Sequence, residues 1–204
     1  LAAALLYTGN LELPDIPTAT RISIAQKAVS RLQHLERLIQ DMLLFARGEV
    51  LGREEFSLTE LLADLRQTFE PLAGAREVAL AVSDRSAGGR VVGNRKSLTG
   101  ALTNLLENAL HAAPGASERG LVPTVSLLAE TITTGEGAAP CCQIRITGGG
   151  PGMDADTAAR LFEPLFTTRT EGTGLGLAIA RGVARAHGGA IDVVSSPGNG
   201  AEFI

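Results

Sequence analysis

A glycine-rich segment that leads directly into an apolar helix constrains this chain more than any other feature. It reads Gly172-Thr-Gly-Leu-Gly-Leu177 and continues as Ala178-Ile-Ala-Arg181. Glycine lets a backbone approach an anion closely, and the following helix begins with unpaired N–H groups and the positive end of its dipole. The segment therefore predicts a phosphate-binding turn, although by itself it is equally compatible with a flexible loop before a helix.

Three further elements precede this segment. Asn104-Leu-Leu-Glu-Asn108 places two amides four residues apart, on the same face of a helix. Gly148-Gly-Gly-Pro-Gly152 is another glycine-rich turn, the first along the chain, with residues 172–176 as the second, and Leu161-Phe-Glu-Pro-Leu-Phe166 between them supplies two aromatic rings. Together, the four elements favour a phosphate site over a flexible loop.

In this order and spacing, the four elements resemble the N, G1, F and G2 boxes of the sensor histidine kinases of two-component systems. The short loop between Phe166 and Gly172 is similar to that of the nitrogen-regulation and flagellar-regulation branch. The resemblance covers essentially the whole chain. It implies an α+β protein: a helical hairpin that forms a dimeric four-helix bundle, followed by an α/β sandwich of the histidine-kinase/gyrase/Hsp90 ATPase type.

The resemblance also implies a function. The domain would bind ATP with Mg²⁺, the γ-phosphoryl group would pass to a histidine, and the phosphohistidine would supply an aspartate of a response-regulator receiver domain. Asn108 would hold Mg²⁺ through its amide oxygen, a ligand type that this ion accepts. Asn104 would lie beside the phosphates, and Glu107 would bind or orient a metal-bound water. These three residues form the predicted catalytic set. For the two asparagines, a polar helix surface is the alternative.

Further residues are expected to contact the nucleotide. His111 occupies a place where the family often has a basic phosphate contact, and Arg169 in the short loop could reach a phosphate. The remaining candidates lie in the two glycine-rich turns: Gly148, Gly150, Gly152, Thr173, Gly174, Leu175 and Gly176.

Two positions depart from the family pattern. The G1 box usually begins with an aspartate that accepts the exocyclic amine of adenine, and this chain has Gly148 there. Ala201 stands where a threonine or serine is common. Losing a hydrogen bond to a charged group costs about 1.5–3 kcal/mol, a roughly ten- to hundredfold loss of affinity. Two interpretations stay open: a kinase core that binds ATP weakly, or a degenerate core that acts as a dimeric docking module.

The first third of the chain, residues 1–50, is expected to form the dimerisation hairpin. From about residue 20 to residue 47, apolar positions recur at alternating spacings of three and four, the pattern of a coiled coil or helical bundle. Because one chain supplies only two of the four helices of a bundle, we expect a homodimer. Packing of the hairpin against the second domain is the alternative. The seam comprises Ala25, Ala28, Leu32, Leu35, Ile39, Met42 and Ala46.

The second domain, residues 54–204, is expected to bind ATP and follows a short break at 48–53. Ser57 begins a capping box, and the helix after it should end near Gly74. Asp154 is a second candidate N-cap. This mixture of elements favours helices packed on one face of a sheet. Further helices are predicted at 96–113, 154–161 and 175–187, and strands at 78–82, 90–92, 122–133, 141–147, 191–194 and 201–204.

No histidine of this chain has the sequence context of a phosphoacceptor. The three histidines are His34, His111 and His187, and His34 is followed by Leu-Glu-Arg, which is typical of a solvated surface position. Residues 1–7 resemble the segment that follows the phosphoacceptor in the family, so we expect that histidine to lie upstream and this chain not to autophosphorylate. A gyrase-like or chaperone-like ATPase is a further candidate, which the heptad seam and the short loop disfavour.

The net charge, the apolar runs and the cysteines of the chain indicate which partners and which location to expect. The net charge of −4, from 18 basic and 22 acidic residues, gives no electrostatic support for nucleic-acid binding. No apolar run approaches the roughly 18 residues that span a bilayer, so no membrane segment is expected in this chain. Cys141 and Cys142 are adjacent and cannot build a disulfide framework, which favours a reducing, cytoplasmic location.

Overall fold

The computed structural model describes residues 8–9, 11, 16–29, 32, 52–133, 140–169 and 172–204. The chain divides into two compact units, residues 1–47 and 48–204. Across the described ranges, no helix combines the length and the hydropathy that a membrane crossing needs.

In the first unit, a helix spans residues 18–29. Ala28, a position of the predicted seam, is buried at 4% exposure. The seam positions after Leu32 and also His34 lie outside the described residues. Three large apolar side chains of this unit stay about half exposed, as expected of a face that one chain cannot cover: Ile22, Val29 and Leu32.

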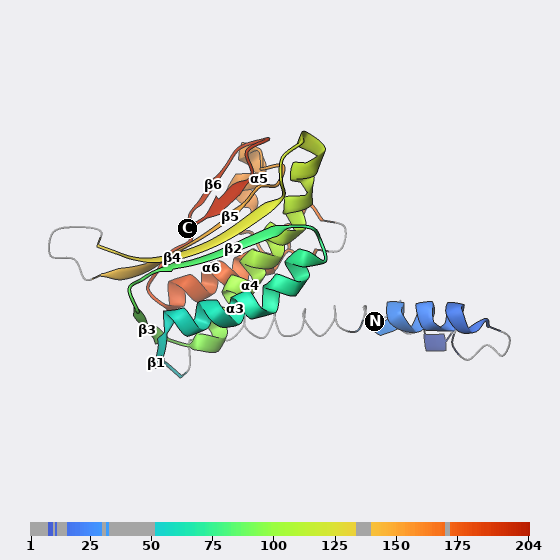
Figure 1. The fold of residues 1–204 in the computed structure, drawn as a ribbon, viewed down its shortest axis with the longest axis horizontal. Coiled ribbons are helices and arrows are strands. Elements are labelled where there is room, and N and C mark those ends of the chain that lie inside the picture. Colours follow the sequence, from blue (N-terminus) through green and yellow to red (C-terminus); the bar gives the residue numbers. More distant parts are fainter. Residues whose placement is uncertain are drawn as a thin grey trace. The chain divides into compact units, whose positions relative to one another are not determined.

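The second unit has two layers, a sheet and a layer of helices on one of its faces (Figure 1). The sheet has the order β2-β4-β5-β7-β6; β2 is parallel to β4 and the other neighbours are antiparallel. The predicted α+β class with helices on one face is confirmed. The strands are β2 (Ala79–Arg85), β4 (Thr124–Ile132), β5 (Cys141–Gly148), β6 (Val193–Ser195) and β7 (Ala201–Phe203), and the helices are α3 (Leu58–Gly74), α4 (Arg95–Ala112) and α6 (Gly176–Ala186).

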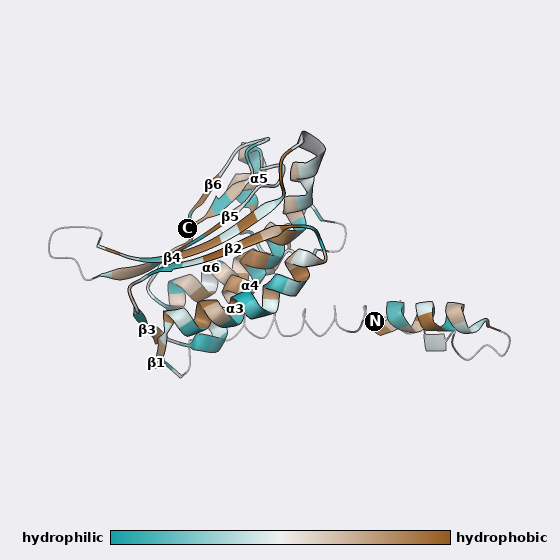
Figure 2. Cartoon of the chain, in the orientation of Figure 1, coloured by the Kyte–Doolittle hydropathy of each residue, from teal (hydrophilic) through white to brown (hydrophobic). Residues whose placement is uncertain are grey.

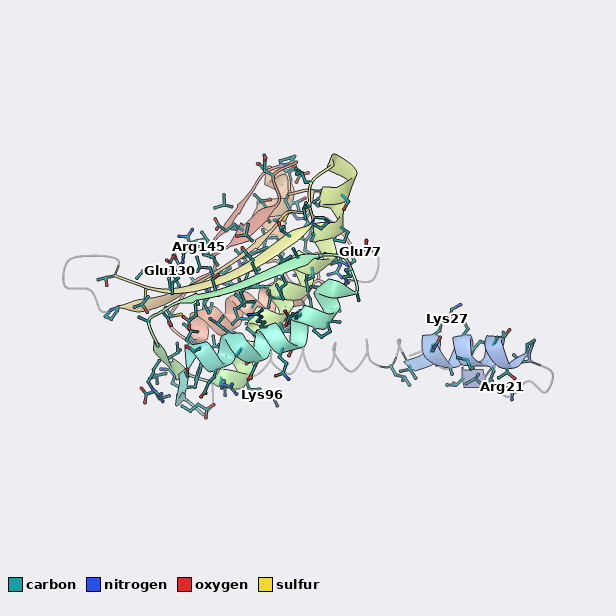
Figure 3. All side chains as sticks on the ribbon, viewed as in Figure 1. Arg21, Lys27, Glu77, Lys96, Glu130 and Arg145 are labelled. Atoms are coloured by element: carbon teal, nitrogen blue, oxygen red, sulfur yellow. The ribbon has the colours of Figure 1, made fainter. Side chains whose placement is uncertain are left out.

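Alternation along the strands separates the two faces of the sheet. Val125, Leu127 and Ala129 of β4 are buried beneath the helices, whereas the residues between them point to the open face. On that face Arg145 bridges Glu130 and a glutamate of β7 at 3.5 and 3.6 Å (Figure 3). Strands and helices accordingly mix hydrophobic and hydrophilic residues along their length (Figure 2).

Two predicted helix caps are confirmed. The Ser57 hydroxyl accepts the Glu60 N–H at 3.4 Å at the start of α3. The Asp154 carboxylate accepts the Thr157 N–H at 2.7 Å at the start of α5 (Ala155–Arg160), and this bond lowers the pKa of Asp154. Local side-chain chemistry was therefore sufficient to locate both helix starts.

Two elements are not among the predicted ones. Between the predicted break and the Ser57 cap lies β1 (Glu54–Ser57), which pairs with β3 (Arg90–Gly93) in a separate two-stranded sheet. Only Phe56 of β1 is buried, so the strand lacks an alternating apolar pattern. After α4, the chain continues as a 3₁₀ helix, η1 (Ala113–Arg119), with a proline in its first turn, where a missing N–H costs nothing.

His187 joins the end of α6 to the start of α4. Its Nε2 accepts the backbone N–H of Asn94 at 3.0 Å, and its Nδ1 lies 2.7 Å from the Val183 carbonyl oxygen. With Nε2 as the acceptor, Nδ1 is the ring nitrogen that can donate to the Val183 carbonyl oxygen. Gly93 allows this approach, because a Cβ there would lie 2.5 Å from the imidazole.

We expect His187→Ala to lower the free energy of unfolding by about 1–3 kcal/mol, because it removes the acceptor of a backbone donor at the start of α4. Urea unfolding followed by circular dichroism measures the change. His111→Ala, on the same helix layer, should change stability by less than about 0.5 kcal/mol. Equal effects of the two substitutions would contradict the structural role of His187.

Candidate functional site

The predicted site elements come together beside the N-terminus of α6. Asn104 Nδ2 donates to the Gly176 carbonyl at 3.2 Å, across 72 positions of sequence. Arg169 Nη1 donates to Asn108 Oδ1 at 2.9 Å. A Cβ on Gly176 would lie 3.3 Å from Asn104 Cγ, so a glycine permits this close packing. The start of α6 and the loop that carries Arg169 therefore each contact one of the two asparagines of α4.

The second glycine-rich turn is joined to the aromatic segment through the backbone. Leu165 N–H donates to the Gly174 carbonyl at 2.9 Å. Gly174 has φ +68, and a Cβ there would overlap the Leu165 backbone. The Thr173 hydroxyl accepts the Leu175 N–H at 3.2 Å, and α6 begins with no side-chain cap. The first N–H groups of α6 can therefore serve an anion.

Two arginines that the sequence analysis did not single out hold the aromatic rings. Arg181 lies over the ring of Phe162 at 5.0 Å and donates to its carbonyl at 3.1 Å. Arg160 lies over Phe166 at 4.3 Å. Such cation–π contacts contribute about 0.5–2 kcal/mol each. No periodicity predicts them, since they depend on how α5 and α6 approach this segment.

The first glycine-rich turn lies at the end of β5, against α4. A Cβ on Gly148 would lie 3.3 Å from Ala109 Cβ, and one on Gly150 would lie 2.8 Å from Ala112 Cβ. Gly148 is the register partner of Ala201 on β7. The two positions that depart from the family pattern are thus direct neighbours, and neither supplies a polar side chain.

Ser195 is a residue of the site region that sequence reasoning missed. Its hydroxyl accepts the Met153 N–H at 3.0 Å and donates to the Gly200 carbonyl at 2.6 Å. Gly198 N–H donates to the Pro151 carbonyl at 2.7 Å. These bonds fix the first glycine turn against the β6–β7 turn. A serine before a turn is too common to have signalled this role.

Positive charge collects near the predicted phosphate contact His111. Partial burial lowers the pKa of His111, and the nearby guanidinium groups of Arg169 and Arg76 lower it further. The imidazole is therefore largely neutral at pH 7. Arg76, which follows α3, was not among the predicted residues. A bound anion would oppose the effect of both arginines on this pKa.

The donor set of the site suits Mg²⁺ bound through amide oxygen, water and phosphate. Among the described residues, no group of three or more His, Cys, Asp or Glu side chains could hold a metal. Asn104, Glu107 and Asn108 are all partly exposed on one face of α4. Mg²⁺ keeps several waters and needs few protein ligands, so one amide oxygen with a neighbouring carboxylate fits it.

Comparison with known proteins identifies the family of this chain. The model of the histidine kinase-, DNA gyrase B-, and HSP90-like ATPase family matches residues 93–204, from the end of β3 through β7. The chain therefore belongs to this ATPase family.

Individual similar proteins indicate which kind of ATPase the chain resembles. The sensor protein kinase FleS of Pseudomonas aeruginosa is 38% identical over 200 residues, which cover 98% of this chain and 46% of FleS. Full-length ShkA in complex with AMPPNP is 27% identical with a TM-score of 0.75, over 98% of this chain and 41% of ShkA. The histidine kinase ThkA in complex with the response regulator TrrA shares the fold, at 22% identity and a TM-score of 0.73, over 98% of this chain and 56% of that one.

The chain thus belongs to this ATPase family and is similar over nearly its whole length to two-component sensor histidine kinases, as the four sequence elements predicted. It spans about half the length of the FleS relative.

Proposed function

We propose that this chain binds Mg²⁺–ATP between α4 and the N-terminus of α6 and supplies the γ-phosphoryl group for transfer to a protein histidine. The observation that carries the proposal is the pair of contacts on α4, from Asn104 to the Gly176 carbonyl and from Arg169 to Asn108. The ATP analogue AMPPNP bound by the related ShkA supports the choice of nucleotide. Because the reaction consumes ATP, we place it in the cytoplasm.

The side chains have distinct tasks in this reaction. Mg²⁺ would supply charge neutralisation at the phosphates, and Asn108 would hold it, with Glu107 orienting a water beside it. The first N–H groups of α6 and the Arg169 guanidinium would bind phosphate oxygens. Asn104 positions the start of α6 through the Gly176 carbonyl. Phosphoryl transfer depends mainly on such positioning and electrostatic stabilisation.

The partner that accepts the phosphate from the phosphohistidine would be an aspartate in the receiver domain of a response regulator. The similarity of this chain to sensor protein kinases supports this proposal. We propose no role for nucleic acid.

Asn108→Ala is expected to weaken binding of AMPPNP in the presence of Mg²⁺ on the order of ten- to hundredfold, the range seen when metal sites lose a supporting group. Binding without Mg²⁺ should change little, because the amide acts through the metal. Isothermal titration calorimetry with and without Mg²⁺ measures both. Thr99→Ala, earlier on α4, is the control. An unchanged Mg²⁺ dependence in Asn108→Ala would refute the proposed metal ligand.

A degenerate docking module is the second candidate. The pairing of Gly148 with Ala201 favours it, since the predicted base-binding position carries no polar side chain on either strand. ATP affinity separates the two candidates. Binding of Mg²⁺–ATP too weak to measure at millimolar nucleotide would select the docking module.

We further propose a homodimer through the N-terminal helical unit. The half-exposed Ile22, Val29 and Leu32 support it, because a helix in a bundle buries such residues against a partner. Multi-angle light scattering at micromolar concentration should give twice the chain mass of 21.1 kDa. Val29→Glu with Leu32→Glu should shift the chain to monomer while α3 to β7 stay folded. A wild-type monomer with intact helical content would contradict the dimer.

A further inference from the structure

The Arg169 side chain contacts the very atom predicted to bind the metal. Its Nη1 donates a 2.9 Å hydrogen bond to Oδ1 of Asn108, 61 positions earlier on α4. Oδ1 is the acceptor of that amide, whereas Nδ2 carries two hydrogens and donates. The guanidinium and a divalent cation would therefore compete for the same oxygen atom.

A closed backbone turn directs Arg169 toward α4. Arg169 N–H donates to Thr167 Oγ1 at 3.1 Å, and the Thr167 hydroxyl lies 3.4 Å from the Arg169 carbonyl oxygen, to which it donates. Gly172 N–H donates to the same carbonyl at 3.2 Å. A Cβ on Gly172 would overlap Thr167 Oγ1, so the turn requires glycine there. The position of the guanidinium is thus set by the backbone as well as by the side chain.

We propose, building on the proposed function, that Arg169 is a latch on Asn108 that excludes a bare metal ion until a nucleotide arrives. A divalent cation alone would have to displace the guanidinium and then remain close to its positive charge, which Coulomb repulsion opposes. A metal–nucleotide complex brings phosphate oxygens that accept the released guanidinium. One arginine thereby makes binding of the metal depend on the nucleotide.

The Arg169→Gln variant tests the exclusion of bare metal and the binding of the metal–nucleotide complex separately. The nucleotide-free variant should bind Mn²⁺ at least about tenfold more tightly than the wild type, a coupling of ordinary size. Electron paramagnetic resonance of free Mn²⁺ measures this affinity. The same variant should bind Mg²⁺–AMPPNP several-fold more weakly, because the phosphates lose an arginine. A general disturbance of the loop would weaken both, so opposite changes identify the latch.

Two comparisons control the experiment. Arg185→Gln removes the same charge from the other end of α6 and should leave both affinities within twofold of wild type. Asn108→Asp supplies a carboxylate that binds Mn²⁺ more strongly than an amide, and adding Arg169→Gln to it should again tighten Mn²⁺ at least about tenfold. The latch is overturned if Arg169→Gln leaves the Mn²⁺ affinity unchanged in both backgrounds.

The double variant Asn108→Ala with Arg169→Gln tests whether the metal binds to Oδ1 of Asn108. The gain in Mn²⁺ affinity should disappear in this pair, and a gain that persists would place the metal elsewhere and refute the latch.

The binding of Mg²⁺–AMPPNP tests the proposed function separately from the latch. If wild-type binding of Mg²⁺–AMPPNP does not depend on Asn108, the proposed function fails and the latch fails with it. If it does depend on Asn108 and Mn²⁺ binding ignores Arg169, only the latch fails.

Discussion

Gly152→Ala is expected to destabilise the ATPase unit by about 2–5 kcal/mol. A Cβ at this position would overlap the Ser196 carbonyl oxygen and lie 3.1 Å from that of Gly200. Overpacking of this kind costs about 1–3 kcal/mol, and the φ of +73 adds about 1–2 kcal/mol for a residue with a side chain. Relief of the overlap would also separate the glycine turn from the β6–β7 turn. Urea unfolding of the second unit measures the loss.

Gly198→Ala is the matched control. Its φ is +83, but no atom lies within 4 Å of an added Cβ, so only the backbone strain of about 1–2 kcal/mol applies. The difference between the two variants therefore measures the packing of the two turns. If both variants lose the same stability, backbone conformation alone requires glycine at Gly152 and the close packing carries no energy.

Gly148→Asp is expected to tighten ATP about ten- to hundredfold and to leave GTP unimproved. If the base lies at this end of β5, a carboxylate there can accept the exocyclic amine of adenine, worth about 1.5–3 kcal/mol, whereas guanine offers a carbonyl at that place. The new Cβ would sit 3.3 Å from Ala109 Cβ, so α4 must yield by a few tenths of an ångström. Calorimetry with both nucleotides measures the selectivity.

Gly148→Ala isolates the steric part of that change, because it adds the Cβ without an acceptor. We expect it to weaken both nucleotides equally or not at all. In the unmodified chain, ATP and GTP should bind weakly, with similar affinity and in a Mg²⁺-dependent manner. Tight, adenine-selective binding by the unmodified chain would show that another group reads the base, and the interpretation of Gly148 and Ala201 as a lost base contact would be wrong.

Much of the second unit could be predicted from the sequence because its signals are local. A hydroxyl or carboxylate at Ser57 and Asp154 caps a helix through an N–H three residues away, so the helix start follows from neighbouring residues. The spacing of Asn104 and Asn108 placed both amides on one helix face in the same way. Glycine-rich turns before a helix likewise depend on only a few consecutive residues.

Other features required the tertiary structure, since they join residues far apart in the chain. β1 has no apolar alternation and becomes a strand only by pairing with β3. Register alone makes Gly148 and Ala201 neighbours, and a serine as ordinary as Ser195 gains its role from the turn it meets. The sequence by itself determined the class of protein and predicted the residues of its site. Only the packing of α4, α6 and the aromatic segment placed the Arg169 guanidinium on Asn108, because no local pattern encodes a contact across 61 residues.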